Sequence, residues 1–343
     1  NLMDRFGTVL VMKYFVVLAA FLAPIYPLTE SFSGLLILQI IIGGAVSFGW
    51  AGAQTLIAQV TNGDAKYIGR FSFASRIGTT TAPLIAGVIW DLGGTWPSYF
   101  LASIWGVVLF GTLFLVPNIE IKFVKNKVQI KNSKQTQFSI RDLFPRFSDY
   151  VRSFSMMLIP IVAISVTIMF LRNSTSSVNN SIYVVYLDGI GMTGTMIGFL
   201  FAAIEASSGI GSLLGGRAMK LGDPRWSMII GTAAAIFFIC ITPLLGGIFI
   251  ILLLAQIVRG LLQGVIQPVM FSVQTKAVGS HEQGALVGLR QTMNRLSAII
   301  VPPVMGLIAD QWGIEESFII LGAGLLFLCL LVSIWIGRVP NNK

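Results

Sequence analysis

The chain has 343 residues, of which 55% are hydrophobic and 11% are charged, and its mean hydropathy is +0.82. A soluble globular domain normally carries about 25% charged residues, so this composition excludes one. The net charge of +9 does not indicate nucleic-acid binding, because the chain has no basic soluble domain. The chain has one histidine and two cysteines, too few of these side chains to indicate a metal site or a redox enzyme.

Long uncharged stretches follow one another along the chain. The segments 31–63, 226–258 and 317–337 contain no Asp, Glu, Lys or Arg. A helix that crosses a bilayer needs about 20 predominantly apolar residues, so these stretches predict membrane helices. In chain order the pattern predicts ten of them, at roughly 8–27, 33–60, 70–92, 97–117, 157–187, 192–216, 226–244, 248–274, 284–310 and 315–337.

A spaced pattern of residues, P-x3-G-x3-D-x2-G, occurs twice, once in each half of the chain. The two copies, each with an arginine upstream at the same spacing, are Arg76, Pro83, Gly87, Asp91 and Gly94, and Arg295, Pro302, Gly306, Asp310 and Gly313. An internal repeat in a membrane protein is typical of transporters built from two homologous halves. We therefore predict an N-terminal half over 1–117, a central loop over 118–152 and a C-terminal half over 153–343.

Basic residues of the connecting segments predict the orientation. If the first helix leaves the cytoplasm, the outer loops contain acidic residues such as Asp188 and Glu316 but no Lys or Arg, and Lys134 and Lys276 fall inside. Lys and Arg are retained in the cytoplasm during insertion. The sequence thus predicts an integral protein of the plasma (cytoplasmic) membrane whose central loop and C-terminus are cytoplasmic.

Residues 118–152 form the one extended polar segment. Its second part mixes arginines with phenylalanines, a pattern that predicts a short amphipathic helix on the inner membrane surface. A docking site for a regulatory partner is the alternative.

The two halves differ in helix count. Two helices of the second half precede the basic turn at 219–222, whereas the first half begins at a matching turn, 4–7. A complete repeat would add two helices upstream. We therefore expect a chain of six plus six helices that is N-terminally truncated here, so that ten are present, and we expect this fragment alone not to transport.

These features resemble the major facilitator superfamily. The segment 3–7 is similar to the core of that family's loop motif between the second and third helices, and the segment 259–264 resembles its arginine motif. The segment 78–83 with Gly87 resembles the antiporter motif of the fifth helix. The resemblance covers nearly the whole chain. It implies an all-α polytopic membrane protein with two six-helix repeats, acting as a secondary active transporter or permease that moves a small solute by alternating access.

The resemblance also implies roles for two sets of residues. A gating motif would place Asp4 against a helix end across the cytoplasmic gate, and it comprises Asp4, Arg5 and Gly7. A helix-packing motif comprises Gly78, Pro83, Gly87, Pro302 and Gly306. Independently, Gly211 with Gly215 and Gly284 with Gly288 have GxxxG spacing, which lets helix backbones approach closely, although glycines that face lipid would show the same spacing.

Charged and amide residues inside the predicted helices are the candidate site. A charge at mid-bilayer costs about 3 kcal/mol, so it is usually paired or faces water. The candidates for substrate binding or coupling are Arg172, Ser176, Asn179, Tyr183, Glu205, Arg259, Gln263 and Gln267. They either line a solute path or form a buried hydrogen-bond network that fixes helix packing.

Arg172 and Glu205 are predicted to form an ion pair. Arg172 precedes Asp188 by the same number of positions by which Glu205 follows Gly189. An antiparallel hairpin that turns at 188–189 places both charges at the same depth, about 24 Å from the turn. Movement of one helix could then couple proton transfer to gate opening. A purely structural salt bridge is the alternative.

The expected partners are a small-molecule substrate, protons and the lipid bilayer, with no cofactor, no metal and no nucleic acid, in a monomer. Two arginines and several amides suit an anionic or polyhydroxylated solute, whereas the aromatic and methionine content suits an apolar drug equally well. We expect no enzymatic activity. A non-transporting membrane sensor or a polytopic membrane enzyme is the alternative function.

Overall fold

The computed structural model describes residues 8–60, 65–115, 154–218, 222–245, 247–277 and 283–339. The predicted gating residues Asp4, Arg5 and Gly7 and the central segment 118–152 lie outside these ranges. The predicted pair Gly284 and Gly288 falls outside the residues whose surroundings are described. The regular structure within the described ranges is helical throughout, as the composition predicts.

Each of the ten predicted spans contains at least one helix within the described residues, which confirms the all-α prediction. The first half contains α2 (Thr8–Leu22), η1 (Ala23–Leu28), α3 (Phe32–Val60), α4 (Ala65–Gly93) and α5 (Thr95–Leu115). The second half contains η3 (Met156–Leu158), α8 (Pro160–Asn179), α9 (Ile182–Gly189), α10 (Gly194–Ala218), α11 (Pro224–Cys240), η4 (Pro243–Leu245), α12 (Phe249–Ala277), α13 (Gln283–Trp312) and α14 (Ile314–Arg338). Within the described ranges, eight spans are long and apolar enough to cross a membrane, and α11 is a shorter apolar helix.

One predicted span is interrupted. The expected helix at 157–187 becomes α8 and α9, which are separated at Asn180 and Ser181. The Ser181 hydroxyl donates to the Ser177 carbonyl at 2.7 Å, and the Ser181 backbone leaves the helical region at φ −127° and ψ −100°. Asn and Ser compete with helical hydrogen bonds through their own side chains, so a break at this pair has a local cause.

The sequence repeat is also a structural repeat. Pro83 lies inside α4 and Pro302 inside α13, and each copy of the pattern ends at a single glycine that separates two long helices. Gly94 has φ 73° and Gly313 has φ 104°. Glycine adopts positive φ at low cost, so both helices end where the pattern places its last glycine.

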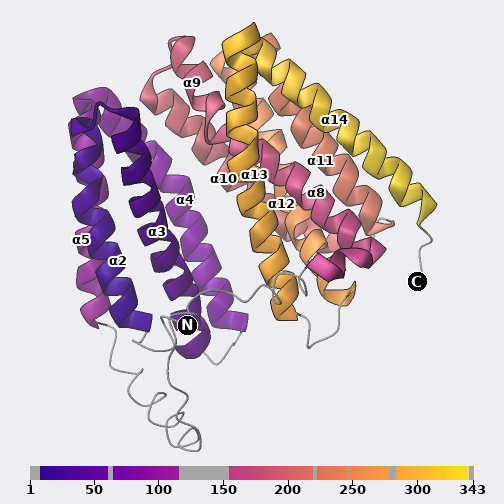
Figure 1. The fold of residues 1–343 in the computed structure, drawn as a ribbon, viewed down its shortest axis with the longest axis horizontal. Helices are drawn as coiled ribbons and strands as arrows, with labels where there is room; N and C mark the ends of the chain where they lie inside the picture. Colours follow the sequence, from indigo (N-terminus) through magenta and orange to yellow (C-terminus); the bar gives the residue numbers. More distant parts are fainter. Residues whose placement is uncertain are drawn as a thin grey trace, which may run out of the picture. The chain divides into compact units, whose positions relative to one another are not determined.

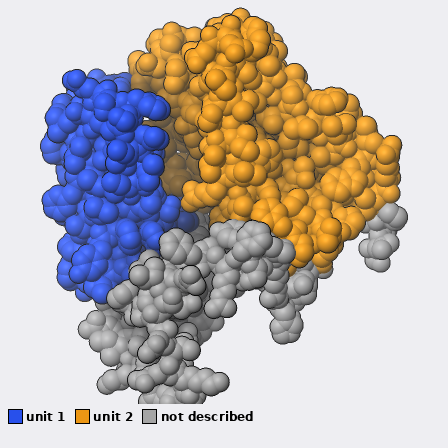
Figure 2. All heavy atoms as spheres, viewed as in Figure 1, with its two compact units in different colours: residues 1–75, 88–145 blue, residues 76–87, 146–343 orange. Residues whose placement is uncertain are grey.

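The chain divides into two compact units, residues 1–75 with 88–145, and residues 76–87 with 146–343 (Figure 2). In the first unit α2 packs against α3 and α5 (Figure 1). Phe15 stacks on Phe48 with ring centroids 4.4 Å apart, and Lys13 Nζ lies 3.8 Å from the centroid of the Phe114 ring. The division differs from the expected halves at residues 76–87, which belong to the second unit.

Glycines hold α10 and α12 together in the second unit. A Cβ added to Gly211 on α10 would overlap the Leu261 carbonyl oxygen, and one added to Gly264 on α12 would overlap the Ser208 carbonyl oxygen. Close backbone packing of this kind drives helix association in bilayers, where water exclusion does not operate. The predicted close approach at Gly211 and Gly215 is therefore confirmed, since a Cβ at Gly215 would overlap Pro268.

Two residues of the expected helix-packing motif, Pro83 and Gly87, lie at close contacts between helices. A Cβ at Gly87 would overlap the Gly194 carbonyl oxygen, and a Cβ at Gly198 would overlap the carbonyl oxygen of Pro83. These contacts bring residues 83–87 of α4 against the start of α10, inside the second unit. No described heavy atom lies within 4 Å of an added Cβ at Gly78 or Gly306.

An acidic residue caps the start of α11. Asp223 accepts hydrogen bonds from the backbone N of Arg225 at 2.9 Å and from its Nη2 at 2.7 Å. Arg225 is only 4% exposed, and its Nη1 donates to the Val339 carbonyl at 2.9 Å, which ties the start of α11 to the end of α14. An N-cap of this kind stabilises a helix by about 1 kcal/mol.

Candidate functional site

A polar cluster lies where residues 76–87 of α4 meet α8, α10 and α12 in the second unit. Arg76 Nη1 donates to Glu205 Oε2 at 2.9 Å, and Arg76 Nη2 donates to Gln267 Oε1 at 3.2 Å. The Thr79 hydroxyl donates to the same Glu205 oxygen at 3.3 Å. Arg172 Nη2 reaches Gln267 Oε1 at 3.4 Å, so one glutamine oxygen bridges two guanidinium groups.

The predicted ion pair between Arg172 and Glu205 is wrong in its partner. Among the described residues, the basic residue paired with Glu205 is Arg76, and the two side chains retain 38% and 35% exposure. Arg172 and Glu205 do lie in one cluster, joined through Arg76 and Gln267. Equal depth does not determine how each helix is rotated about its axis, and that rotation selects the partner.

The guanidinium of Arg172 is incompletely hydrogen-bonded by the described residues. Its two described bonds, to Asn173 Oδ1 and Gln267 Oε1, are both 3.4 Å long, and its buried Nε has no partner among the described residues. The cluster of two arginines and one glutamate therefore carries one surplus positive charge. A charged donor is expected to bind an acceptor when buried, because an unsatisfied charged group is costly.

Two hydrogen bonds join α8 to α12 on one side of the cluster, toward the C-terminal end of α8. Gln263 Nε2 donates to the Thr175 hydroxyl at 2.7 Å, and Gln256 Nε2 donates to Asn179 Oδ1 at 3.3 Å. All four side chains are buried. Asn179 and Gln263, both candidates for a solute path, thus bond to the neighbouring helix in this conformation.

Two further candidates lie on the same part of the chain. Ser176 is half-buried on α8. Tyr183 on α9 is 1% exposed, and its ring lies 6.5 Å from Phe201 and 6.4 Å from Phe318, centroid to centroid. Tyr183 therefore packs in an aromatic group of the apolar core as well as presenting a hydroxyl.

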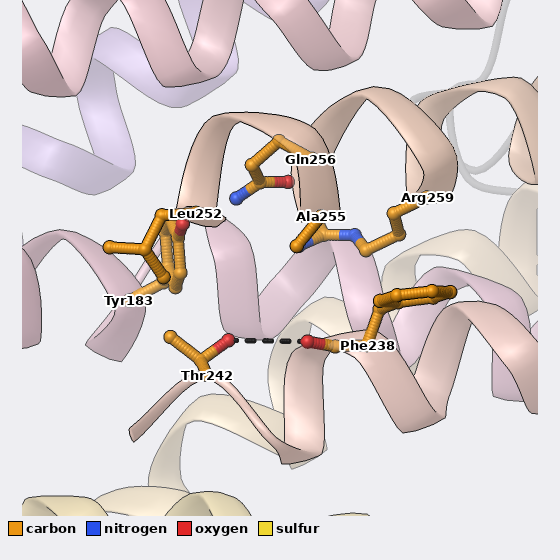
Figure 3. A pocket seen from close by; sticks show the side chains of 7 residues that line it. All are labelled: Tyr183, Phe238, Thr242, Leu252, Ala255, Gln256 and Arg259. Atoms are coloured by element: carbon orange, nitrogen blue, oxygen red, sulfur yellow. Dashed lines mark hydrogen bonds between the residues drawn. The ribbon is translucent and has the colours of Figure 1, made fainter. Parts of the chain in front are cut away.

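Arg259 lies apart from the cluster, in a narrow recess between α9, α11 and α12 (Figure 3). It is 2% exposed, and its Nε and Nη2 have no hydrogen-bond partner among the described residues. In Figure 3 the side chain runs along α12 toward Ala255. The other lining residues are Tyr183, Phe238, Thr242, Leu252, Ala255 and Gln256.

Reasoning from sequence missed Arg76 as a member of the site. Arg76 belongs to the repeat, upstream of Pro83. It lies near the inner end of its helix, however, where an arginine can extend to the lipid headgroups instead of pairing inside the protein. Thr79 and Thr175 were missed too, because a hydroxyl in an apolar helix has no signature of its own. Such a hydroxyl can donate to its own backbone, as Thr175 does to the Arg172 carbonyl at 2.7 Å.

Comparison with known proteins gives a family. The sequence profile of the Major Facilitator Superfamily matches residues 1–175 and 163–343. The chain is 25% identical over 280 residues to the uncharacterized MFS-type transporter YuxJ of Bacillus subtilis (strain 168), covering 79% of this chain and 65% of that protein. It is 28% identical over 158 residues to the probable sulfoacetate transporter SauU of Cupriavidus necator, covering 45% of this chain and 35% of that protein.

The chain thus spans 65% or less of the length of these two relatives. The profile nevertheless covers both halves, and the described helices include eight candidate membrane spans and an internal repeat of the kind that transporter folds contain. The chain is an integral membrane protein with several spans, and it belongs to the major facilitator superfamily.

Proposed function

We propose that the protein is a secondary active transporter that moves a small organic anion across the cytoplasmic membrane by alternating access and couples this movement to protons. The observation that carries the proposal is the surplus positive charge of the cluster formed by Arg76, Glu205, Gln267 and Arg172. Charged residues in membrane helices are costly and mark substrate or ion pathways. A bound acid group would give Arg172 Nε an acceptor, which no described residue supplies.

The substrate class has support from a relative as well as from the cluster. SauU is named as a probable sulfoacetate transporter, and sulfoacetate carries a sulfonate and a carboxylate. Planar guanidinium groups suit such oxyanions, because they donate two parallel hydrogen bonds. We therefore favour a small carboxylate or sulfonate over a polyhydroxylated solute or an apolar drug.

Proton coupling is assigned to Glu205, the acidic member of the cluster. As a carboxylate it accepts from Arg76 and Thr79. A proton on Glu205 would remove the ion pair and free Arg76 for the solute, so that proton and anion bind together. Movement of α10 against residues 76–87 of α4 would change the same contact during the transport cycle.

The proposed orientation places the C-terminus and the central loop in the cytoplasm. It rests on the outer connections, which contain no Lys or Arg. Single cysteines at Asp188 and Glu316 should react with an impermeant thiol reagent from outside, and those at Lys134 and Lys276 only after the membrane is opened. Labelling of all four from one side would contradict the orientation.

Uptake by proteoliposomes that contain the protein, expressed from its complete coding sequence, tests the function. The panel would include labelled mono- and dicarboxylates, small sulfonates, sugars and lipophilic cations. We expect saturable uptake of one class of anion. Arg172→Gln should lower this uptake at least about 10-fold, because a hydrogen bond to a charged group contributes about 1.5–3 kcal/mol.

Arg290→Gln is the matched control, since Arg290 is half-buried on α13 and its guanidinium lies 3.5 Å from the Phe271 ring, not in the cluster. It removes the same charge and should leave the anion preference unchanged. Uptake of a neutral or cationic solute with no anion uptake, or equal uptake by the Arg172→Gln variant and the unaltered protein, would refute the proposed substrate class.

A further inference from the structure

Gln267 on α12 holds two guanidinium groups on one oxygen atom. Arg76 Nη2 on α4 donates to Gln267 Oε1 at 3.2 Å, and Arg172 Nη2 on α8 donates to the same oxygen at 3.4 Å. An amide oxygen has two lone pairs, so it can accept both hydrogen bonds. Two positive charges therefore converge on an acceptor that carries no charge of its own.

A charged acceptor would bind these two groups more strongly than the amide does. A carboxylate or sulfonate oxygen attracts a guanidinium through its charge as well as through the hydrogen bond. The cluster itself contains this comparison, because Arg76 Nη1 donates to the carboxylate of Glu205 at 2.9 Å, a shorter distance than either bond to Gln267. The acid group of a solute would therefore compete with Gln267 for the two arginines.

The unpartnered nitrogen of Arg172 lies on the same edge of its guanidinium as the nitrogen that Gln267 binds. Nε and Nη2 form the side edge of the group, and their N–H bonds point in the same direction. This is the geometry that binds an acid group through two parallel hydrogen bonds. Nη2 donates to Gln267, and the buried Nε has no partner among the described residues. Gln267 thus occupies one half of a position that suits two oxygens.

The side chain of Gln267 is easier to displace than that of the preceding glutamine on α12. Gln267 is half-buried, and its bonds to the arginines are 3.2 Å and 3.4 Å long. Gln263, one turn earlier, is buried and donates to the Thr175 hydroxyl at 2.7 Å. A new rotamer of Gln267 would release both arginines and leave the bond between Gln263 and Thr175 in place.

We propose that Gln267 is an internal placeholder, whose amide oxygen occupies the position that an oxygen of the solute's acid group takes when the solute binds. The inference rests on the proposed transport of a small organic anion. One carboxylate or sulfonate accepts from Nε and Nη2 of Arg172 and from Nη2 of Arg76, and the Gln267 side chain swings aside. A single acid group fills this position, so a solute with one such group is sufficient.

Thermal unfolding of Gln267→Glu in detergent tests the inference with no solute present. The substitution keeps the length of the side chain and adds a fixed carboxylate at the proposed position of the acid group. It should raise Tm by at least about 2 °C, because it neutralises the surplus charge of the cluster. Gln311→Glu is the matched control, at an exposed glutamine near the C-terminal end of α13, and should leave Tm unchanged. An equal or lower Tm in Gln267→Glu would overturn the inference.

Uptake by proteoliposomes distinguishes displacement from a structural role, with labelled carboxylates and sulfonates as the probes. The fixed carboxylate of Gln267→Glu should abolish uptake of the anion that the unaltered protein transports, and Gln311→Glu should keep it. Gln267→Met retains a flexible side chain of similar length but removes the amide. The solute then has no internal competitor, so its half-saturating concentration should fall several-fold.

A structural role for Gln267 predicts different results. Loss of a structural contact in Gln267→Met would raise the half-saturating concentration or lower the maximal rate. Either result, or anion uptake retained by Gln267→Glu, would overturn the placeholder and leave the proposed function standing. Absence of anion uptake by the unaltered protein would refute the proposed function instead, and the Tm comparison would still decide whether an acid group fits at the position of Gln267.

Discussion

Gly264 is the position where a single methyl group tests the packing of α10 against α12. A Cβ at Gly264 would overlap the Ser208 carbonyl oxygen and would lie 2.9 Å from both the carbonyl carbon and the Cα of Ser208. All three are backbone atoms, so no side-chain rotation can relieve the contact. Gly264→Ala must therefore push the two helices apart.

The magnitude follows from comparison with a matched glycine. Overpacking of this kind typically costs about 1–3 kcal/mol. Alanine also gains about 0.5–1 kcal/mol over glycine within a helix. At Gly209 on α10, no described heavy atom outside the adjoining turns of the helix lies within 4 Å of an added Cβ, so Gly209→Ala should show the gain alone. Because the gain is common to both variants, Gly264→Ala should be less stable than Gly209→Ala by about 1–3 kcal/mol.

Unfolding of both variants by sodium dodecyl sulfate in mixed micelles, followed by tryptophan fluorescence, measures this difference in the free energy of unfolding. A third variant, Gly211→Ala, checks it. A Cβ at Gly211 would overlap the Leu261 backbone, so this variant should behave like Gly264→Ala. Equal stability of Gly264→Ala and Gly209→Ala would refute the close approach of α10 and α12.

Two further predictions concern hydrogen bonds. Burial raises the pKa of the Asp223 carboxyl, but the hydrogen bonds and the charge of Arg225 outweigh burial and leave the pKa below its ordinary value. The stabilisation of the folded state by ionised Asp223 is therefore complete above the unfolded pKa and is lost as the pH falls through the folded pKa. Asp223→Asn should reduce the loss of stability that acid causes. An unchanged dependence of the free energy of unfolding on pH would contradict this. A double-mutant cycle with Thr175→Val and Gln263→Leu should give a coupling energy of about 0.5–1.5 kcal/mol between α8 and α12, and a value near zero would show that their 2.7 Å hydrogen bond contributes nothing.

The helices could be predicted from the sequence because a membrane span is recognised by the length of an apolar segment alone. The ends of α4 and α13 could be predicted as well, since Gly94 and Gly313 occupy equivalent places in the repeat and both have positive φ. The break at Asn180 and Ser181 had a local signal in its polar residues. These features depend on neighbours in the chain, which the sequence displays directly.

The partner of Glu205 could not be predicted in the same way. Position along a helix fixes depth, but contact depends on which helices are neighbours and how each is rotated. Here Gly87 and Pro83 pack on Gly194 and Gly198, and that approach brings Arg76 of α4 to Glu205. Such non-local packing leaves no mark in the spacing of the charges.

Arg172, Ser176 and Asn179, polar residues spaced along α8, were ambiguous for a related reason. Residues at i, i+4 and i+7 share one face whether that face lines a solute path or meets another helix. Asn179 receives a hydrogen bond from Gln256, whereas the Nε of Arg172 bonds to none of the described residues. The structure thus separates side chains that the sequence could only group together.

The central claim is that Glu205 couples protons to the movement of an anion, and the Glu205→Gln variant of the protein in proteoliposomes tests it most directly. Two rates are measured once a transported anion is known, exchange of that anion at equal concentrations and its accumulation driven by a proton gradient. Asp188→Asn, at an exposed acidic residue, is the control and should keep both. We predict that Glu205→Gln keeps exchange and loses accumulation, and intact accumulation in this variant would contradict the account.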